Sequence, residues 1–235
     1  MSRNVLKIIA CLSMLVDHAG YILFPELDAL RCIGRLAMPI FAFFIGEGCL
    51  YTKDRKKYLI RVLSLGVVCQ LFYVGEYFIA GSGDPFYLNI LLTFSASVII
   101  CSAFLDCYGE NAVRKNGREN IILGVTVAFF GLLCFLNERG IIPLHFDYGY
   151  GGIILPVFAA VTKERKKKLA VFSVGLLLSV LSLDYADTMW TVCALCSIIP
   201  LCFYNGKAGK KNLQKAFYLF YPVHIGVLYI ISFFI

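Results

Sequence analysis

Long apolar runs separated by short charged or turn-rich segments set the pattern along this chain. A membrane-spanning helix needs about 20 mostly apolar residues, with a range of about 17–25. The runs that meet or approach this length cover residues 5–24, 33–50, 58–80, 87–107, 120–136, 150–161, 169–183, 189–204 and 215–235. The pattern predicts nine transmembrane helices. The sixth run begins with Gly151-Gly152 and contains Pro156, which predicts a kinked, tilted or re-entrant segment.

Composition agrees with a membrane protein. Of the 235 residues, 60% are hydrophobic and 16% are charged, against roughly 25% charged residues in an ordinary soluble domain. The mean hydropathy is +0.78, and a soluble domain of this size cannot bury so much apolar surface. This excludes a soluble enzyme, a disordered chain and a secreted disulfide scaffold. We expect an all-α polytopic transmembrane helix bundle, with residues 1–235 as a single domain.

The basic residues predict how the bundle is oriented. Of the 22 Lys and Arg residues, all except Arg31, Arg35 and Arg139 fall in one alternate set of connecting segments. Such asymmetry marks the cytoplasmic side. It places the N-terminus in the cytoplasm and, with nine spans, the C-terminus outside, in a multi-pass protein of the bacterial inner membrane. The net charge of +7 is then a topology signal, and we expect no nucleic-acid partner.

Cysteines and soluble-enzyme motifs give little further chemistry. Most of the ten Cys residues lie inside apolar runs, where Cys behaves as a small hydrophobe. Cys193-x-x-Cys196 resembles half of a redox or zinc site but has no second Cys or His pair nearby, so we expect packing and no metal. The sequence has no Walker loop, G-x-S-x-G, H-E-x-x-H or helix-leading G-x-G-x-x-G.

Three ionisable residues inside apolar runs are the first candidates for function, because such groups are costly in a bilayer and often mark sites. Asp17 and His18 lie in the first run, and His224 lies in the last on one helical face with Tyr221. His18 suits a general acid or base. Neighbours on a helix point about 100° apart, so we expect Asp17 to orient a partner. His224 needs a polar partner, for which His18, Tyr218 and Tyr221 are candidates. The alternative is that these groups join helices together.

Further candidates flank the second run and the loop before the sixth. Arg35 suits an anion or a thioester carbonyl, with an interfacial Arg as the alternative. Glu47 stands between Gly46 and Gly48, which permit close approach of a backbone or ligand; the alternative is an ion pair with the basic segment 53–57. Asp147 and Tyr148 lie beside His145 in a Gly-rich loop, which suits either a site rim or an interfacial turn.

Two basic segments are candidates for binding phosphate groups. Asn205-Gly206-Lys207-Ala-Gly-Lys210 combines Lys with turn-forming Gly, and so offers charge and backbone donors. The segment 163–168 is explained well enough by topology and by contact with lipid headgroups.

Several motifs resemble the TraX family in order along the chain. They include Leu15-Val-Asp17-His18-Ala-Gly20, Ile33-Gly34-Arg35-Leu-Ala-Met-Pro39, Glu47-Gly48, Phe146-Asp147-Tyr148-Gly149, Asn205-Gly206-Lys207 and Tyr221-Pro222-x-His224. Residues 81–138 carry little of the resemblance. The family is grouped with membrane acyltransferases that use acyl-CoA, and TraX proteins are linked to N-acetylation of conjugative pilin. The resemblance implies an acyltransferase, and carries a site over to Asp17, His18, Arg35, Glu47 and His224.

The residues and the resemblance together suggest a mechanism. Acetyl-CoA would dock its phosphates on Lys57, Lys207 and Lys210. His18, with its imidazolium stabilised by Asp17, would deprotonate an acceptor amine or hydroxyl on a peptide N-terminus, a glycan or a lipid. Arg35 would polarise the thioester carbonyl or hold the acceptor, and His224 would protonate the leaving thiolate. A proton-coupled transporter and a membrane scaffold or assembly protein are the alternatives.

Overall fold

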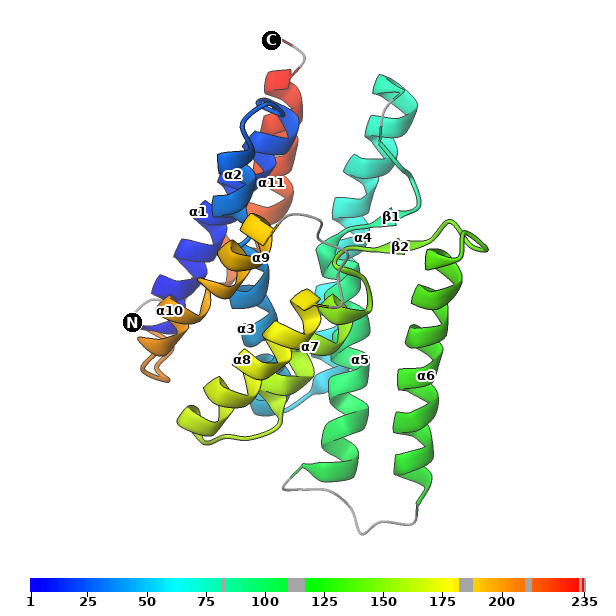
Figure 1. The fold of residues 1–235 in the computed structure, drawn as a ribbon, viewed down its shortest axis with the longest axis vertical. Coiled ribbons are helices and arrows are strands. Elements are labelled where there is room, and N and C mark those ends of the chain that lie inside the picture. The colour runs from blue at the N-terminus through cyan, green and yellow to red at the C-terminus, as the bar shows by residue number, and fades with distance from the viewer. Residues whose placement is uncertain (82, 110–116, 182–187, 210–212, 233, 235) are drawn as a thin grey trace. The chain divides into compact units, whose positions relative to one another are not determined.

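A computed structural model describes residues 1–81, 83–109, 117–181, 188–209, 213–232 and 234 (Figure 1). Within these residues nearly every ordered segment is helical, which confirms the prediction of an all-α bundle. The helices are α1 (Arg3–Ile22), α2 (Asp28–Gly34), α3 (Ala37–Tyr51), α4 (Arg55–Ala80), α5 (Ile90–Tyr108), α6 (Arg118–Glu138), α7 (Gly149–Ala160), α8 (Arg165–Leu181), α9 (Thr188–Leu195), α10 (Ile198–Cys202) and α11 (Gln214–Ser232). Two short parallel strands, β1 (Tyr87–Leu88) and β2 (His145–Phe146), join the α4–α5 and α6–α7 connections.

Helices occupy all nine predicted runs, but they differ in length. Among the described residues, six apolar helical segments are long enough to cross a membrane: Arg3–Ile22, Asp28–Tyr51, Arg55–Ile79, Ile90–Tyr108, Arg118–Glu138 and Gln214–Ser232. The other three runs are shorter. Helix α7 has 12 residues and α8 has 17, while Met189–Cys202 is divided into α9 and α10. At about 1.5 Å per residue, α7 extends about 18 Å against a hydrocarbon core of about 30 Å.

The second run is also divided, between α2 and α3. Pro39 lies near the start of α3, and a proline ring clashes with the carbonyl four residues earlier, which here belongs to Arg35. Residues 35 and 36 accordingly form a turn between the two helices. Arg35 therefore lies at a break within a membrane-spanning segment.

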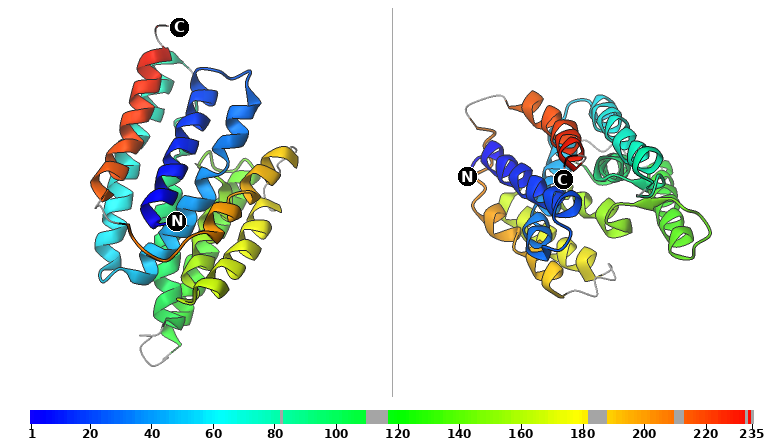
Figure 2. Two further views of the ribbon diagram at one scale, coloured as in Figure 1. Left: turned by 90° about the vertical axis from the view of Figure 1, so that its left-hand side faces the viewer. Right: turned by 90° about the horizontal axis from the view of Figure 1, so that it is seen from above.

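The chain divides into two compact units. Unit 1 comprises Met1–Phe41 and Asp184–Ile235, and unit 2 comprises Ala42–Leu183. This division does not test the expectation that residues 1–235 form a single domain, which stays a prediction. In unit 1, α1 packs against both α2 and α11, and α9 packs against α2. Figure 2 shows α1 (blue) and α11 (red) side by side in both views.

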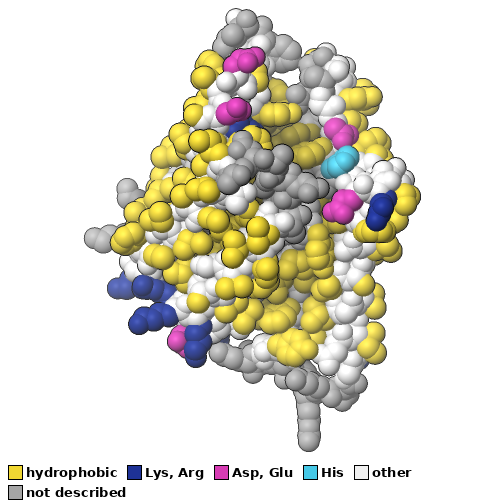
Figure 3. Space-filling model, viewed as in Figure 1, with side chains coloured by type: hydrophobic (Ala, Val, Ile, Leu, Met, Phe, Trp, Pro, Cys, Tyr) yellow, Lys and Arg dark blue, Asp and Glu magenta, His cyan; other side chains and the backbone are white. Residues whose placement is uncertain are grey.

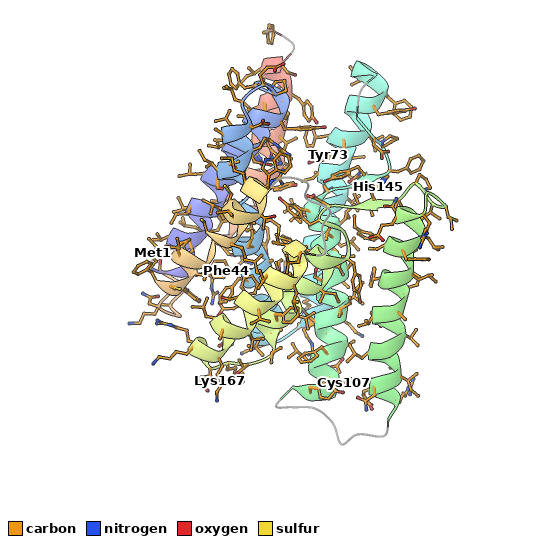
Figure 4. The ribbon with its side chains drawn as sticks, in the orientation of Figure 1. Met1, Phe44, Tyr73, Cys107, His145 and Lys167 are labelled. Carbon is orange, nitrogen blue, oxygen red and sulfur yellow. The ribbon has the colours of Figure 1, made fainter. Side chains whose placement is uncertain are left out.

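Helix α5 is the centre of unit 2. It packs against α4, α6 and α7, and α8 packs against α7. One end of the unit holds the two strands, and the other holds a buried cluster formed by Cys49, Cys101, Leu105 and Ala160. In Figure 4, Tyr73 and His145 lie at the strand end, whereas Cys107 and Lys167 lie at the opposite end.

The basic segments of unit 2 lie at the end away from the strands. The α3–α4 turn follows Cys49 and the α7–α8 turn follows Ala160, so residues 53–61 and 163–168 share this end. In Figure 3, Lys and Arg gather at the lower left, where Figure 4 labels Lys167, and hydrophobic side chains cover most of the rest of the viewed face. Within unit 2 the structure thus places these two basic segments at the same end, and the membrane topology stays a prediction.

Candidate functional site

The two membrane-embedded histidines meet in unit 1. His18 on α1 and His224 on α11 are 206 residues apart, and His18 Nδ1 lies 2.7 Å from His224 Nε2. His224 is buried, with 5% of its surface exposed, and His18 is partly buried. His224 Nδ1 lies 2.8 Å from the carbonyl oxygen of Phe220, one turn earlier on α11. Of the three partners considered for His224 in the sequence, the structure selects His18.

Aromatic rings enclose this pair. The Tyr221 ring is nearly perpendicular to both imidazoles, and its centroid is 6.2 Å from that of His18 and 5.6 Å from that of His224. Phe220 lies nearly parallel to His224, with ring centroids 4.7 Å apart. Tyr221 thus lies beside both histidines, and the two rings restrict the orientation of His224.

Asp17 has a different partner from His18. Its Oδ2 accepts a hydrogen bond from Arg31 Nη1 on α2 at 2.9 Å, and the same nitrogen is 3.3 Å from the Asp17 carbonyl oxygen. Asp17 therefore contacts Arg31, and the expectation that it orients a partner stays a prediction. Gly34 lies against the carboxylate so closely that a Cβ at this position would be 2.1 Å from Asp17 Oδ1. The glycine is therefore required by the close packing of α2 on α1.

Arg35 is buried in the same unit and lies over an aromatic ring. Its guanidinium carbon is 4.4 Å from the centroid of the Trp190 ring on α9, and that of Arg31 is 5.9 Å from the same ring. A guanidinium over the face of Trp is a favourable cation–π arrangement. Trp190 thus holds two arginines near the site, and the Arg35 side chain is buried within the protein.

The loop with Asn205 and Lys207 lies at the start of α1. Arg3 N donates to the Lys207 carbonyl at 2.8 Å, and Asn205 N donates to the Met1 carbonyl at 2.9 Å. Lys207 N donates to Asn205 Oδ1 at 3.0 Å. These two backbone donors of the loop are therefore used within the protein, while the Lys207 side chain is exposed and can approach a phosphate. Lys210 lies outside the described residues.

Glu47 belongs to unit 2, where it forms a buried ion pair. Its Oε1 accepts a hydrogen bond from Lys168 Nζ at 2.9 Å, and the side chains of Glu47 and Lys168 are 7% and 2% exposed. Lys168 Nζ also lies 4.9 Å from the centroid of the Tyr51 ring. The ion-pair alternative to a substrate-binding role named the segment 53–57, but the partner is on α8.

The glycines beside Glu47 serve helix packing. A Cβ on Gly46 would lie 2.1 Å from the carbonyl oxygen of Pro156 on α7, and one on Gly48 would lie 2.4 Å from the Tyr58 hydroxyl. Of the two predicted uses, close approach of a backbone therefore applies to Gly46. The structure surrounds Glu47 with α7, α8 and the start of α4.

Lys57 lines an open hollow at the basic end of unit 2. The hollow has a volume of about 470 Å³ and is lined by Thr52, Lys53, Asp54, Lys57, Ile60 and Arg61. Asp54 Oδ1 accepts a hydrogen bond from Lys57 N at 2.9 Å. This backbone hydrogen bond holds the pKa of Asp54 below its usual value. With three cations and one carboxylate, the lining carries a net positive charge that suits a phosphate group.

Asp147 and Tyr148 lie at the strand end of unit 2. Asp147 Oδ1 accepts a hydrogen bond from the Tyr87 hydroxyl at 2.6 Å, and its carbonyl oxygen accepts one from Thr93 at 3.1 Å. Burial, and then the Asp147 carboxylate, raise the pKa of Tyr87 above its usual value. Tyr148 has φ 59° and precedes α7. About 18 Å of α7 separates this end from the end where α7 meets the Cys49 cluster.

Within each of the two units, the structure brings some of the predicted residues together. Asp17, His18, Arg35, Tyr221 and His224 form one cluster in unit 1. In unit 2, Glu47 and Lys57 lie toward the basic end and Asp147 and Tyr148 toward the strand end.

Sequence reasoning assigned no role to three residues that complete these groups: Arg31, Lys168 and Trp190. Trp190 is the single Trp of the chain, which is the one signal that pointed to it. Within the described ranges, no group of three or more His, Cys, Asp or Glu side chains is arranged to hold a metal ion.

Comparisons with known proteins place this arrangement in a family. Residues 2–232 match the model of the TraX protein family. The chain is 31% identical to a protein of Dichelobacter nodosus named probable fimbrial assembly protein FimC, serogroup H1, across 97% of each chain. It is 40% identical to the uncharacterized protein RP591 of Rickettsia prowazekii (strain Madrid E), over 30% of this chain and 26% of that one. No solved structure matches the chain.

Proposed function

Because the chain belongs to the TraX family, which its residues 2–232 match, we propose that it is an integral membrane acyltransferase of the bacterial inner membrane. It transfers an acetyl or other short acyl group from acyl-CoA to an amine or hydroxyl group of an acceptor. The observation that carries the proposal is the contact between His18 and His224 inside a membrane helix bundle, with Arg35 in the same unit. A general base can activate the acceptor in acyl transfer from a thioester, and a fixed cation can stabilise the oxyanion that forms.

The reaction needs one proton acceptor and one stabilised oxyanion. His18 takes the proton of the acceptor amine or hydroxyl as that group attacks the thioester carbonyl carbon. Arg35 stabilises the oxyanion of the tetrahedral intermediate. The carbon–sulfur bond then breaks, and the histidine pair returns the proton to the departing thiolate. The products are the acylated acceptor and free CoA.

The donor approaches from the end of unit 1 where α1 begins. Lys207 is at this end, and its loop is hydrogen-bonded to the first residues of α1. His18 lies 14 residues after Asn4, which corresponds to about 21 Å along the helix. The extended pantetheine arm of CoA is long enough to cover a distance of this order. The phosphates at Lys207 and the thioester at His18 are therefore compatible with one bound molecule.

The named relative bears on the acceptor. The Dichelobacter protein is called a probable fimbrial assembly protein, and its similarity extends along 97% of this chain. We therefore expect the acceptor to be the N-terminus of a pilin-like or other exported protein. A glycan or lipid acceptor is the alternative.

The first test is binding of acetyl-CoA to the detergent-purified protein. A saturable rise in melting temperature with acetyl-CoA, larger than that with free CoA, is expected for a specific donor site. Release of free thiol and labelling of an N-terminal peptide by radioactive acetyl-CoA then test transfer. His18→Ala should abolish transfer, and His145→Ala, which changes an exposed His in unit 2, should leave it unchanged. A folded protein that neither binds acetyl-CoA nor transfers its acyl group would contradict the proposal.

Proton-coupled transport is the rival function, and one observation favours it. The Glu47–Lys168 pair is buried within a membrane bundle, and such pairs occur in proton relays. Proton-dependent flux into liposomes without use of CoA would support transport. A protein in which Ala at Asp17, His18 and His224 is tolerated would fit an assembly or scaffold role.

A further inference from the structure

The hydrogen bonds of His224 allow the protons of the histidine pair to be placed. His224 Nδ1 is 2.8 Å from the Phe220 carbonyl oxygen. A carbonyl oxygen only accepts hydrogen bonds, so His224 must carry a proton on Nδ1. A neutral imidazole has one such proton. His224 Nε2 then has no proton and carries a lone pair. The short contact to this nitrogen therefore requires a hydrogen-bond donor on the His18 ring.

That donor is His18 Nδ1, which is 2.7 Å from His224 Nε2. In the neutral pair, His18 therefore carries its proton on Nδ1 and has a lone pair on Nε2. The two bonds form a short chain from His18 through His224 to the Phe220 carbonyl. The chain ends in a backbone group on α11, which is fixed by the helix itself.

The ring geometry supports a true hydrogen bond between the imidazoles. The ring planes differ by 10°, and the centroids are 4.9 Å apart. This separation is close to the N···N distance plus the distances from each nitrogen to its own ring centre. The nitrogens therefore lie almost on the line between the centroids, and the rings are edge to edge in nearly one plane. The lone pair of His224 Nε2 is directed at the His18 N–H, as a hydrogen bond requires.

We propose that His224 is a positioning residue that fixes His18 in the Nδ1–H tautomer and leaves His18 Nε2 as the atom that accepts a proton. Protonation of Nε2 converts the His18–His224 contact into a charge-assisted hydrogen bond, which is stronger than a neutral one. The tautomers themselves follow from the geometry alone. Their catalytic meaning rests on the proposed acyltransferase function.

Nitrogen-15 NMR of histidine-labelled protein tests the tautomers directly. The chain has three His residues, so His18→Gln, His145→Gln and His224→Gln assign every imidazole signal by loss of one set. Above the pH at which the imidazoles are protonated, His18 and His224 should both show a protonated Nδ1 and an unprotonated Nε2. A protonated Nε2 on neutral His18 in the unmodified protein would overturn the proposal. The tautomers are read from the unmodified protein, and two folded variants of the three are enough to assign its signals.

A variant in which residue 224 has no ring nitrogen tests whether His224 sets the tautomer of His18. In His224→Phe, His18 loses the acceptor for its Nδ1 proton, so its signals should change toward the Nε2–H tautomer or a mixture. In His224→Gln, the side-chain carbonyl offers a replacement acceptor and should retain the Nδ1–H form in part. An unchanged His18 tautomer in folded His224→Phe would contradict a positioning role.

Kinetics separate this proposal from the proposed function. If acyl transfer occurs, His224→Phe should lower kcat by about 10²-fold or more, which is within the range for general-base catalysis. The KM for acetyl-CoA should change little. His224→Gln should recover part of the loss in kcat. Equal loss in both variants through KM would count against positioning. If the tautomers are found as stated and no transfer is detected, the acyltransferase proposal fails and the tautomer assignment remains.

Discussion

Asp17 and His18 are adjacent in sequence, yet each contributes to a different contact. Asp17 pairs with Arg31 on α2, and His18 pairs with His224 on α11. The two residues thus tie both neighbouring helices to α1 from one turn. The sequence predicted that Asp17 stabilises the His18 imidazolium. Because Asp17 pairs with Arg31 instead, our proposal gives this role to His224. Asp17 instead holds Arg31, whose guanidinium lies over the Trp190 ring.

Gly34 gives a prediction at the same scale. In Gly34→Ala, the new Cβ would lie 2.1 Å from Asp17 Oδ1, so α2 must move away or the Asp17–Arg31 pair must break. Overpacking of this kind typically costs about 1–3 kcal/mol. We expect a lower melting temperature in detergent and reduced turnover.

Gly124 on α6 supplies the matched control. A Cβ there has no atom within 4 Å, and Ala favours a helix over Gly by about 1 kcal/mol. Gly124→Ala should leave the melting temperature unchanged or raise it slightly. Equal effects of the two substitutions would show that Gly34 is not held by contact with Asp17.

At the scale of helices, α3 and α8 of unit 2 are joined by the Glu47–Lys168 pair. Breaking a buried pair by removing one partner costs about 3–5 kcal/mol, because the other charge remains buried. Lys168→Met should therefore strongly lower the melting temperature. The double variant Glu47→Leu/Lys168→Met removes both charges and should recover much of the loss.

Lys167 is the control for this prediction. It is the preceding residue, and its side chain is 71% exposed. Lys167→Met should therefore have a melting temperature close to that of the unmodified protein. If Lys168→Met lowers the melting temperature as little as Lys167→Met does, the Glu47–Lys168 pair contributes little to the stability of unit 2.

The strand end of unit 2 gives a second prediction about elements. Tyr87 on β1 donates to Asp147, which directly follows β2. Hydrogen bonds to charged groups contribute about 1.5–3 kcal/mol, so Tyr87→Phe should destabilise the protein. Tyr77→Phe, which changes a tyrosine on α4 that is 43% exposed, should have little effect.

The same bond predicts a dependence on pH. The pKa of Tyr87 is raised in the folded state. The unfolded protein therefore releases this proton above about pH 10 while the folded protein keeps it. Stability should fall as the pH rises above this value, and the fall should be smaller in Tyr87→Phe. An identical alkaline profile for both proteins would contradict the assigned bond.

The elements also show what a sequence can predict and what it cannot. Apolar runs predicted a helix in each of nine places, because hydrophobic length is a local property. Lys168 was grouped with four neighbouring Lys and Arg residues of one segment, and only the packing of α8 turns it inward to Glu47. In the same way, Asp17, His18 and His224 were recognisable as costly membrane residues. Their partners depend on how distant helices pack, which no local pattern contains.

At the scale of the molecule, unit 1 constrains how many segments cross the membrane. Met1 and Arg3 are hydrogen-bonded to residues 203–208, just before α11. Helix α11 then runs 19 residues, or about 28 Å, away from that point. The start of α1 and the end of α11 therefore lie toward opposite ends of unit 1 (Figure 2). If each of the six long apolar segments of the described residues crosses the membrane, these six alone would bring both to one side, so we predict that an odd number of the three shorter segments also crosses.

This parity argument leads to a topology prediction. If α7, α8 and the segment Met189–Cys202 all cross, the N-terminus and the segment 163–168 face the cytoplasm and residue 232 faces outward. Fluorescent-protein fusions at the N-terminus and within 163–168 should be bright, and a C-terminal fusion should be dark. Alkaline phosphatase fusions should give the reverse pattern. Both ends reporting the same side would contradict nine crossings. A reporter in 163–168 that indicates the outer side would place the basic segment against the positive-inside rule.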